Sequence, residues 1–232
     1  MKKINIYSLI AFSLIFFSPN SFSQSVNKIN PDIILTSDTF CTQYSAKEFL
    51  KLERLNKPID FEIPDIELLN AAIFHLTNKE RKKRKKTVLV FSTELCKAAR
   101  FHSEQMRDKR FFSHKNIKDK EFYSPGDRIK YFGGKFNGWG ENISKYPAVD
   151  YREIYRYGIL SLLPWGKEKI ITPFTYLELA ESMVKGWMGS YGHRKNILHP
   201  DFRFLGYGVA LHGNTYKSKK KKYAYATQNF GG

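Results

Sequence analysis

The side chains best suited to chemistry in this sequence are two histidines and one glutamate. His114 ends the stretch "RFFSH", His193 lies in "YGHR", and Glu141 lies in "WGENI" between them along the chain. Two neutral imidazoles aimed at one point, with a carboxylate close by, form a site for Zn²⁺ or another divalent cation. Both histidines are expected on irregular backbone just past a helix end, where a side chain can point into a cleft. The residues alone leave two interpretations open: such a site, or a chance placement of polar residues.

Common catalytic signatures are absent from the sequence. It contains no HExxH zinc-peptidase motif, no P-loop and no dinucleotide-binding glycine fingerprint. "MGSYG" around Ser190 is not the G-x-S-x-G of a nucleophile elbow, because Met188 stands where the first glycine belongs. His102 shares an apolar helical face with Leu95 and Met106. It is interpreted as a core histidine bonded to a neighbour, with a ligand role as the alternative.

Helical periodicity and capping residues predict the helices that position these side chains. One helix begins at 64–65 and continues with apolar residues at helical spacing, and Ser92 caps a second helix. A turn at 124–129 leads into a short helix. A capping box beginning at Thr175 starts a third amphipathic helix, which is expected to stop at the glycines of 189–192.

β-structure is predicted near the C-terminal end. Residues 205–211 and 222–230 favour strands and partly alternate, so they are expected to pair as a hairpin through a lysine-rich loop. "VLVF" (88–91) is expected to be a short apolar connection, and 133–143 a glycine-rich link. Helices early and strands late predict an α+β fold with layered α/β/α architecture.

The chain divides into a leader, an extension and one domain. Residues 1–23 have the layout of a secretory signal peptide: a basic start, an apolar run and small residues before the cleavage point. Residues 24–63 are expected to form an N-terminal extension with at most short helices. Residues 64–232 are expected to form one domain, with an insertion around 145–173 that is either a lid or a surface elaboration. No second segment is long enough to span a membrane, so the mature protein is expected to be secreted or periplasmic and not transmembrane.

The two cysteines are Cys41 and Cys96. In an exported protein such a pair can form a disulfide. Two buried free thiols are the alternative. The sequence leaves both open because it gives no distance between the two residues.

The chain is strongly basic, with a formal net charge of +17, or two less once Lys2 and Lys3 leave with the leader. Much of this charge lies in two runs, 79–86 and 217–222. Such a surface favours anionic partners such as phospholipid or an acidic envelope polymer, or it simply provides solvated faces. No aromatic residue interleaves with the lysines of either run, which disfavours nucleic acid as the partner.

In their order along the chain, these segments resemble the CAP superfamily of cysteine-rich secretory, antigen and pathogenesis-related proteins, in its secreted bacterial form. The resemblance runs from about Ile66 to Gly231. The motifs that carry it are "LTNKERKK", "LCKAARFHSEQMRDKRFFSH", "SPGDRIKYFGG", "GENI", "VKGWMGSYGHRKNIL" and "LGYGVAL…YATQNFGG".

The resemblance implies an α/β/α sandwich around a small, mostly antiparallel sheet, with a central cleft. It implies that His114 and His193 hold a divalent cation and that Glu141 lines the cleft. A second glutamate of the family corresponds to Ser190, so one carboxylate is missing here. That absence weakens metal affinity and any hydrolytic mechanism that needs two carboxylates.

Three functions follow as hypotheses. The first is a secreted, non-enzymatic binding protein whose cleft holds a divalent cation and which engages a lipid, a sterol or an anionic envelope polymer. The second is a metal-assisted peptide or cell-wall hydrolase with Glu141 as the catalytic base. The third is a basic adhesion or nucleic-acid-binding protein led by the lysine runs, whose binding would depend steeply on salt.

Overall fold

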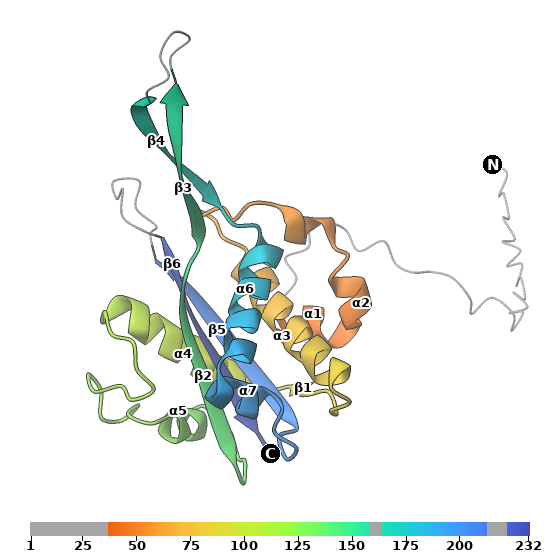
Figure 1. Cartoon of the computed structure of the whole chain (residues 1–232). Coiled ribbons are helices and arrows are strands. Elements are labelled where there is room, and N and C mark those ends of the chain that lie inside the picture. The colour runs from red at the N-terminus through yellow and green to blue at the C-terminus, as the bar shows by residue number, and fades with distance from the viewer. Residues whose placement is uncertain (1–36, 158–163, 213–221) are drawn as a thin grey trace, which may run out of the picture. The chain divides into compact units, whose positions relative to one another are not determined.

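A four-stranded sheet forms the middle layer of the fold, seen in a computed structural model that describes residues 37–157, 164–212 and 222–232 (Figure 1). Its strands, in sheet order, are β1 (Val90–Phe91), β5 (Phe204–His212), β6 (Tyr223–Gly231) and β2 (Trp139–Pro147). β1 runs parallel to β5, and the other neighbours are antiparallel. The predicted mostly antiparallel sheet and its C-terminal hairpin are thereby confirmed.

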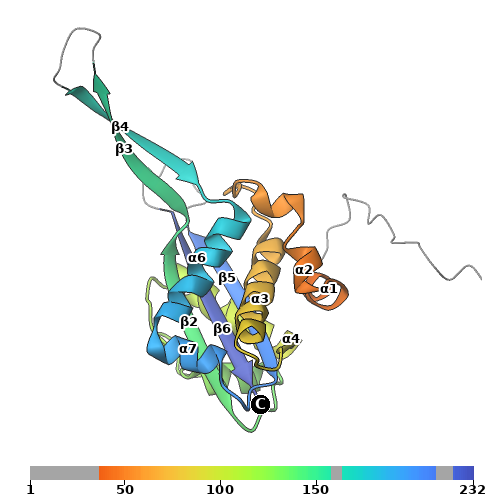
Figure 2. The ribbon, with the colours of Figure 1, turned by 45° about the vertical axis from the view of Figure 1, so that its right-hand side comes forward.

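Helices cover both faces of this sheet, as Figures 1 and 2 show. On one face α4 (Thr93–Asp108) packs on β5 and β6, and α5 (Pro125–Tyr131) packs beside it. On the other face lie α3 (Ile66–Lys83), α6 (Tyr176–Gly189) and α7 (Tyr191–Ile197). These three layers confirm the predicted α/β/α sandwich.

The helices begin where the capping residues predict. Ser92 accepts the Leu95 N–H at the start of α4, and Thr175 forms a capping box with Glu178 at the start of α6. α3 is likewise capped by the carboxylate of Asp65, which accepts a backbone N–H. A capping side chain bonds to a backbone N–H only a few residues away. The local sequence therefore locates these helix starts well.

α6 ends at Gly189, as predicted, but not through a left-handed glycine. Neither Gly189 nor Gly192 takes the left-handed conformation that ends many helices; among the described glycines that conformation is found at Gly133, with φ of 87°. Instead Ser190 adopts an extended conformation, and α7 begins directly after it. His193 therefore lies within a helix, so the expectation of irregular backbone was wrong for His193.

Two predicted links contain strands. The connection at 88–91 includes β1, which is only two residues long and is formed by pairing with β5. The glycine-rich link at 133–143 leads into β2, which pairs with β6 along its whole length. The expectation of links without strands was therefore wrong for both segments. Neither alternates clearly in polarity, and each forms a strand because a neighbouring strand of the sheet pairs with it.

The insertion folds as a separate two-stranded antiparallel ribbon (Figure 2). Its strands are β3 (Val149–Tyr157) and β4 (Pro164–Pro173), and Val149 pairs with Pro173 at the base of the ribbon. Pro147 already belongs to β2, so the insertion proper follows the sheet strand that carries the "GENI" motif.

The N-terminal segment packs into the main core. It forms α1 (Ser37–Gln43), α2 (Ala46–Phe49) and the 3₁₀ helix η1 (Glu53–Asn56), all of them short as expected. Five of its apolar side chains are buried in the same cluster as those of α3 and α6: Phe40, Phe49, Leu55, Ile59 and Phe61. Leu35–Gly232 is accordingly one compact unit.

Both cysteines are free thiols. The Cys41 sulfur lies 2.6 Å from the Tyr207 hydroxyl oxygen, and the Tyr207 N–H donates to the Cys96 sulfur at 3.4 Å. Burial raises the pKa of Cys96 to about 12 and that of Cys41 further. Of the two alternatives that the sequence left open, the structure therefore contains the pair of thiols.

The predicted leader and the 217–221 part of the second lysine run lie outside the described residues. Within the described ranges, no helix combines the length and apolarity needed to cross a membrane.

Candidate functional site

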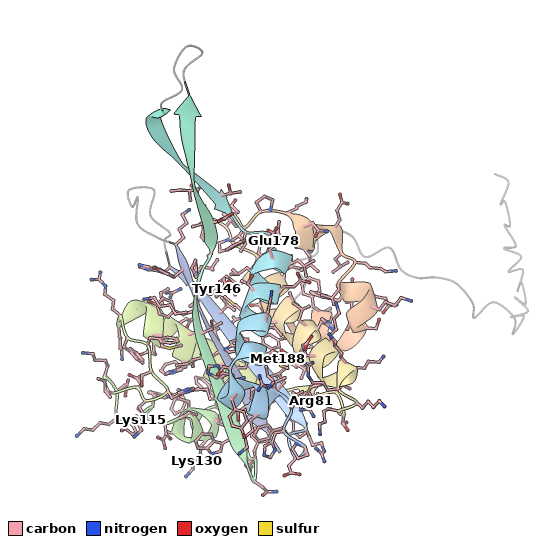
Figure 3. All side chains as sticks on the ribbon, viewed as in Figure 1. Arg81, Lys115, Lys130, Tyr146, Glu178 and Met188 are labelled. Atoms are coloured by element: carbon pink, nitrogen blue, oxygen red, sulfur yellow. The ribbon has the colours of Figure 1, made fainter. Side chains whose placement is uncertain are left out.

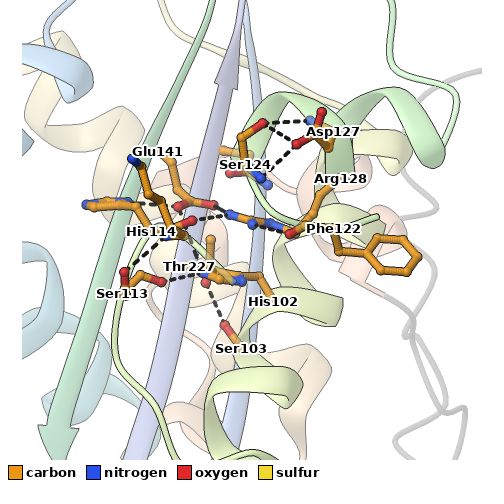
Figure 4. Close-up of polar contacts among 12 residues, drawn as sticks. His102, Ser103, Ser113, His114, Phe122, Ser124, Asp127, Arg128, Glu141 and Thr227 are labelled. Carbon is orange, nitrogen blue, oxygen red and sulfur yellow. Dashed lines mark hydrogen bonds and ion pairs between the residues drawn. The ribbon is translucent and has the colours of Figure 1, made fainter. Parts of the chain in front are cut away.

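The carboxylate of Glu141 is the centre of a polar site between α4, α5 and β2 (Figure 4). Its side chain is 2% exposed. One carboxylate oxygen, Oε1, accepts a hydrogen bond from His114 Nδ1 at 2.8 Å, and the other, Oε2, accepts one from Arg128 Nη2 at 2.7 Å. The buried negative charge is therefore matched by a buried guanidinium and by further hydrogen bonds.

Arg128 ties the carboxylate to the loop that precedes α5. Its side chain is fully buried, and its guanidinium also donates to the backbone oxygens of Phe122 at 2.9 Å and His114 at 3.1 Å. Ser124 and Asp127 fix the start of α5 through a capping box. The capped start of α5 and the Arg128 side chain thus hold the His114 segment against β2.

His114 lies on irregular backbone after α4, as expected, and its side chain is 47% exposed. Because a carboxylate only accepts hydrogen bonds, the Nδ1 atom that faces Glu141 carries the proton. When only Nδ1 carries a proton, Nε2 keeps a lone pair. Metal-binding imidazoles commonly donate their other ring N–H to a carboxylate in this way, which fixes the orientation of the ring.

His193 approaches from the opposite helical layer. It is half-buried on α7, and its pKa is lowered by burial first and then by the nearby imidazole of His114. Both effects favour the neutral, ligand-competent ring at pH 7. The structure therefore brings His114 and Glu141 into direct contact and places His193 within electrostatic reach of His114.

Amide side chains fasten α7 to β2 at this point. Asn196 Nδ2 donates to the Glu141 backbone oxygen at 3.1 Å and to Asn142 Oδ1 at 2.9 Å. Asn142 Nδ2 in turn donates to the backbone oxygen of His193 at 3.2 Å. These contacts fix the position of His193 relative to the strand that carries Glu141.

Ser190 lies at the junction of α6 and α7. Its N–H donates to the Trp187 backbone oxygen at 3.2 Å, and its hydroxyl makes no capping hydrogen bond to α7. No carboxylate stands at this position. Across the described parts of the chain, no group of three or more His, Cys, Asp or Glu side chains is placed to hold a metal ion.

His102 is the core histidine that the apolar helical face predicts. It is fully buried, and its Nε2 lies 2.9 Å from the Ser113 backbone oxygen and 4.0 Å from Glu141 Oε1. Burial, chiefly, lowers its pKa to about 4, so the ring is neutral at pH 7. It forms the inner wall of the polar site and does not face solvent.

Sequence reasoning missed Arg128, Asn142 and Asn196 as members of this site. Arg128 stands within "SPGDRI" and Asn142 within "GENI", both of which the resemblance had singled out without assigning these residues a role. A charged residue directly before a buried Ile129 in a short capped helix was the available signal for Arg128. The amides carried no comparable signal.

Comparison with known proteins finds a family match over more than half of the chain. Residues 74–230 match the model of the family described as CAP, the cysteine-rich secretory protein family.

Two relatives come from Bacillus subtilis. The uncharacterized protein YkwD is 34% identical over 61% of this chain and 42% of its own length. The uncharacterized membrane protein YlbC is 30% identical over 59% of this chain and 30% of its own length. The chain thus spans less than half the length of either relative.

Two solved structures match this chain over part of its length. An extracellular protein containing an SCP domain from Bacillus anthracis is 26% identical, with a TM-score of 0.48, over 72% of this chain and 41% of that one. An outer surface protein of Borrelia burgdorferi is 16% identical, with a TM-score of 0.48, over 76% of this chain and 97% of that one. The family match covers more than half of the 232 residues. The chain therefore belongs to the CAP, or cysteine-rich secretory protein, family.

Proposed function

We propose that this CAP-family protein is an exported, non-enzymatic binding protein that holds a divalent cation, such as Zn²⁺, between His114 and His193. The observation that carries the proposal is the hydrogen bond from His114 Nδ1 to the buried Glu141 carboxylate, which leaves the other ring nitrogen for a ligand. The lowered pKa of His193 supplies a second neutral imidazole beside it.

The cation would be held weakly. Two imidazoles are fewer protein ligands than the three or four of most zinc sites. Glu141 orients His114 and gives charge to the site, but both of its oxygens already accept hydrogen bonds from His114 and Arg128. Water or a group of the bound partner would complete the coordination.

The same geometry supports binding over hydrolysis. A general base needs to reach the proton that it removes, directly or through one water. The Glu141 side chain is 2% exposed and is held by its two partners, and Ser190 stands where the family resemblance expects a second carboxylate. The metal-assisted hydrolase would therefore lack an accessible carboxylate at this site.

Export and the anionic character of the partner are supported by the sequence. The leader-like segment 1–23 and the net charge of +17 fit a protein that works in the periplasm or outside the cell against an acidic lipid or envelope polymer. The relative from Bacillus anthracis is described as extracellular.

The metal site is tested by isothermal titration of ZnCl₂ into protein free of a polyhistidine tag. We expect one binding event in the wild type and none in the His114→Ala/His193→Ala variant. Removing a histidine at the exposed end of β5, in His212→Ala, should leave the binding unchanged. Binding should weaken as the pH falls, because protonation of the two imidazoles competes with the cation.

Equal heats for the wild type and the double variant would remove the metal site from the proposal. Turnover of peptide or peptidoglycan by the zinc-loaded protein, lost in Glu141→Gln, would replace binding by hydrolysis.

A further inference from the structure

Adjacent residues of β2 point to opposite faces of the sheet. Glu141 lies on the face covered by α4, and Asn142 lies on the face covered by α7, where it contacts the backbone of His193. Their cross-strand partners in β6 are Asn229 and Gln228, respectively. Because side chains alternate along a strand, the two pairs act on different helical layers. Of these strand residues, Gln228 is the one to which the polar site gives no role.

Gln228 belongs to a chain of hydrogen bonds whose direction is set at α3. The backbone oxygen of Ile73 can only accept, so the Thr77 hydroxyl donates to it, at 2.7 Å. The Thr77 oxygen in turn accepts from Gln228 Nε2, also at 2.7 Å. This orientation turns Gln228 Oε1 towards Asn142, whose Nδ2 donates to it at 3.2 Å. The chain therefore runs from the backbone of α3 through β6 to β2.

Asn142 continues this chain into α7. Its Nδ2 also donates to the His193 backbone oxygen at 3.2 Å, and its Oδ1 accepts from Asn196 Nδ2 at 2.9 Å. With the amide turned over, Nδ2 would face a donor and Oδ1 would face two acceptors. Asn142 and Gln228 are both fully buried, so water does not replace a bond that is lost. Gln228 thus holds the Asn142 amide in the orientation that contacts His193.

Two arginines attach α7 to the neighbouring helices independently of this chain. Arg81 of α3, labelled in Figure 3, is buried and donates through Nη1 to the Ile197 backbone oxygen at 2.7 Å. Arg194 Nη1 donates to the backbone oxygen of Met188, which is also labelled there, at 2.8 Å. The chain of amides can therefore be broken without detaching the helix. What the amides add is the position of His193 within the site.

We propose that Gln228 is a positioning residue for the cation site, which acts through Asn142 and holds His193 where it can share one ion with His114. The inference rests on the proposed function, because it concerns the site formed by those two histidines. Glu141 orients one imidazole directly, on one face of the sheet. Gln228 places the residue that carries the other imidazole, from the opposite face. Loss of an outer residue of this kind typically weakens metal binding about tenfold or more.

The first test is isothermal titration of ZnCl₂ into the whole protein without a polyhistidine tag. Gln228→Leu should bind zinc about tenfold more weakly than the wild type. Thr77→Val is the matched control, because it removes the other hydrogen bond of Gln228 but leaves the Oε1 acceptor for Asn142, so it should bind as the wild type does. Gln228→Glu should restore binding, because a buried carboxyl group is protonated and then offers the same acceptor and donor as the amide.

Imidazole signals of the metal-free protein provide a second readout that does not depend on zinc. In long-range ¹H–¹⁵N spectra, the ring signals of His193, identified by their absence in His193→Ala, should shift in Gln228→Leu. Those of His114 should stay in place.

Three results decide between the two proposals. Unchanged His193 signals and wild-type zinc affinity in Gln228→Leu would overturn the role of Gln228. Equal losses of affinity in Gln228→Leu and Thr77→Val would also overturn it, because they would assign the effect to stability alone. A wild-type protein that binds no zinc would remove the proposed function instead, and the shift of the His193 signals would still decide whether Gln228 positions that histidine.

Discussion

The Glu141 carboxylate is almost completely buried, and its neighbours must compensate the energetic cost of burying its charge. Arg128, fully buried, provides the compensating charge, while His114 and the Asn229 amide provide further donors. With its amide oriented to satisfy both ends, Asn229 donates to Glu141 Oε2 at 3.3 Å and accepts the Ala99 N–H at 3.2 Å. The orientation of His114, on which the proposed metal site depends, is therefore a product of this charge balance.

Arg128→Leu should destabilise the protein by about 3–5 kcal/mol, because it leaves the Glu141 carboxylate buried without its counter-charge. The double variant Arg128→Leu/Glu141→Leu should lose less than the sum of the two single losses. Urea denaturation of the four proteins measures both effects. Arg107→Leu is the control: its pair with Asp108 is partly exposed, so its loss should cost less than about 1 kcal/mol. Additive losses in the cycle would contradict the coupling.

At the scale of elements, α4 lies very close to β5 at two glycines. A Cβ atom on Gly206 would lie 2.2 Å from the Cys96 backbone nitrogen, and one on Gly208 would lie 2.2 Å from that of Arg100. Ser103, one turn further along α4, donates from its hydroxyl to the Gly208 backbone oxygen at 2.8 Å. The glycines let the helix lie directly on the strand, which brings His102 over Glu141.

Gly208→Ala should therefore destabilise the protein by about 3 kcal/mol, since the added methyl group meets backbone atoms that cannot move aside easily. Gly186→Ala is the matched control, because Gly186 is an exposed position of α6 with nothing within 4 Å of a new Cβ. That change should stabilise the protein by about 1 kcal/mol through helix propensity alone. Thermal unfolding followed by circular dichroism compares the two. A small effect of Gly208→Ala would show that the two layers can separate without cost.

At the scale of the whole molecule, the N-terminal segment and the family domain share one core. Phe49 stacks on His75 of α3 with ring centroids 4.4 Å apart, and the His75 ring lies 3.0 Å from the Phe40 backbone oxygen. Burial lowers the pKa of His75, which keeps this ring neutral at pH 7. The segment 37–61 therefore closes the outer side of α3.

A chain that begins at residue 64 should accordingly fail to fold, whereas one that begins at residue 36 should unfold like the full protein. The shorter chain loses five buried apolar side chains, each worth about 1.5–3 kcal/mol, and this loss is comparable to the whole stability of a typical domain. Near-ultraviolet circular dichroism and urea denaturation of both chains provide the measurement. Cooperative unfolding of the chain that begins at residue 64 would instead establish 24–63 as a dispensable extension.

The sequence by itself determined the features that local chemistry encodes. Helix starts at Asp65, Ser92 and Thr175 follow from side chains that bond the next turn of backbone, and the strands at 205–211 and 222–230 follow from their composition. The ordered motifs also predicted the CAP fold and singled out His114, Glu141 and His193.

Only the tertiary structure decided what these elements contact. β1 and β2 exist because β5 and β6 offer edges to pair with, and neither edge is visible in the local sequence. Arg128 acquires its role from a carboxylate 13 residues away, and His193 acquires its position from amide bonds to β2 across the sheet. Cys41 and Cys96 remain thiols around Tyr207, a residue far from both in the chain. Such pairings depend on the packing of the layers, and a single sequence does not specify that packing residue by residue.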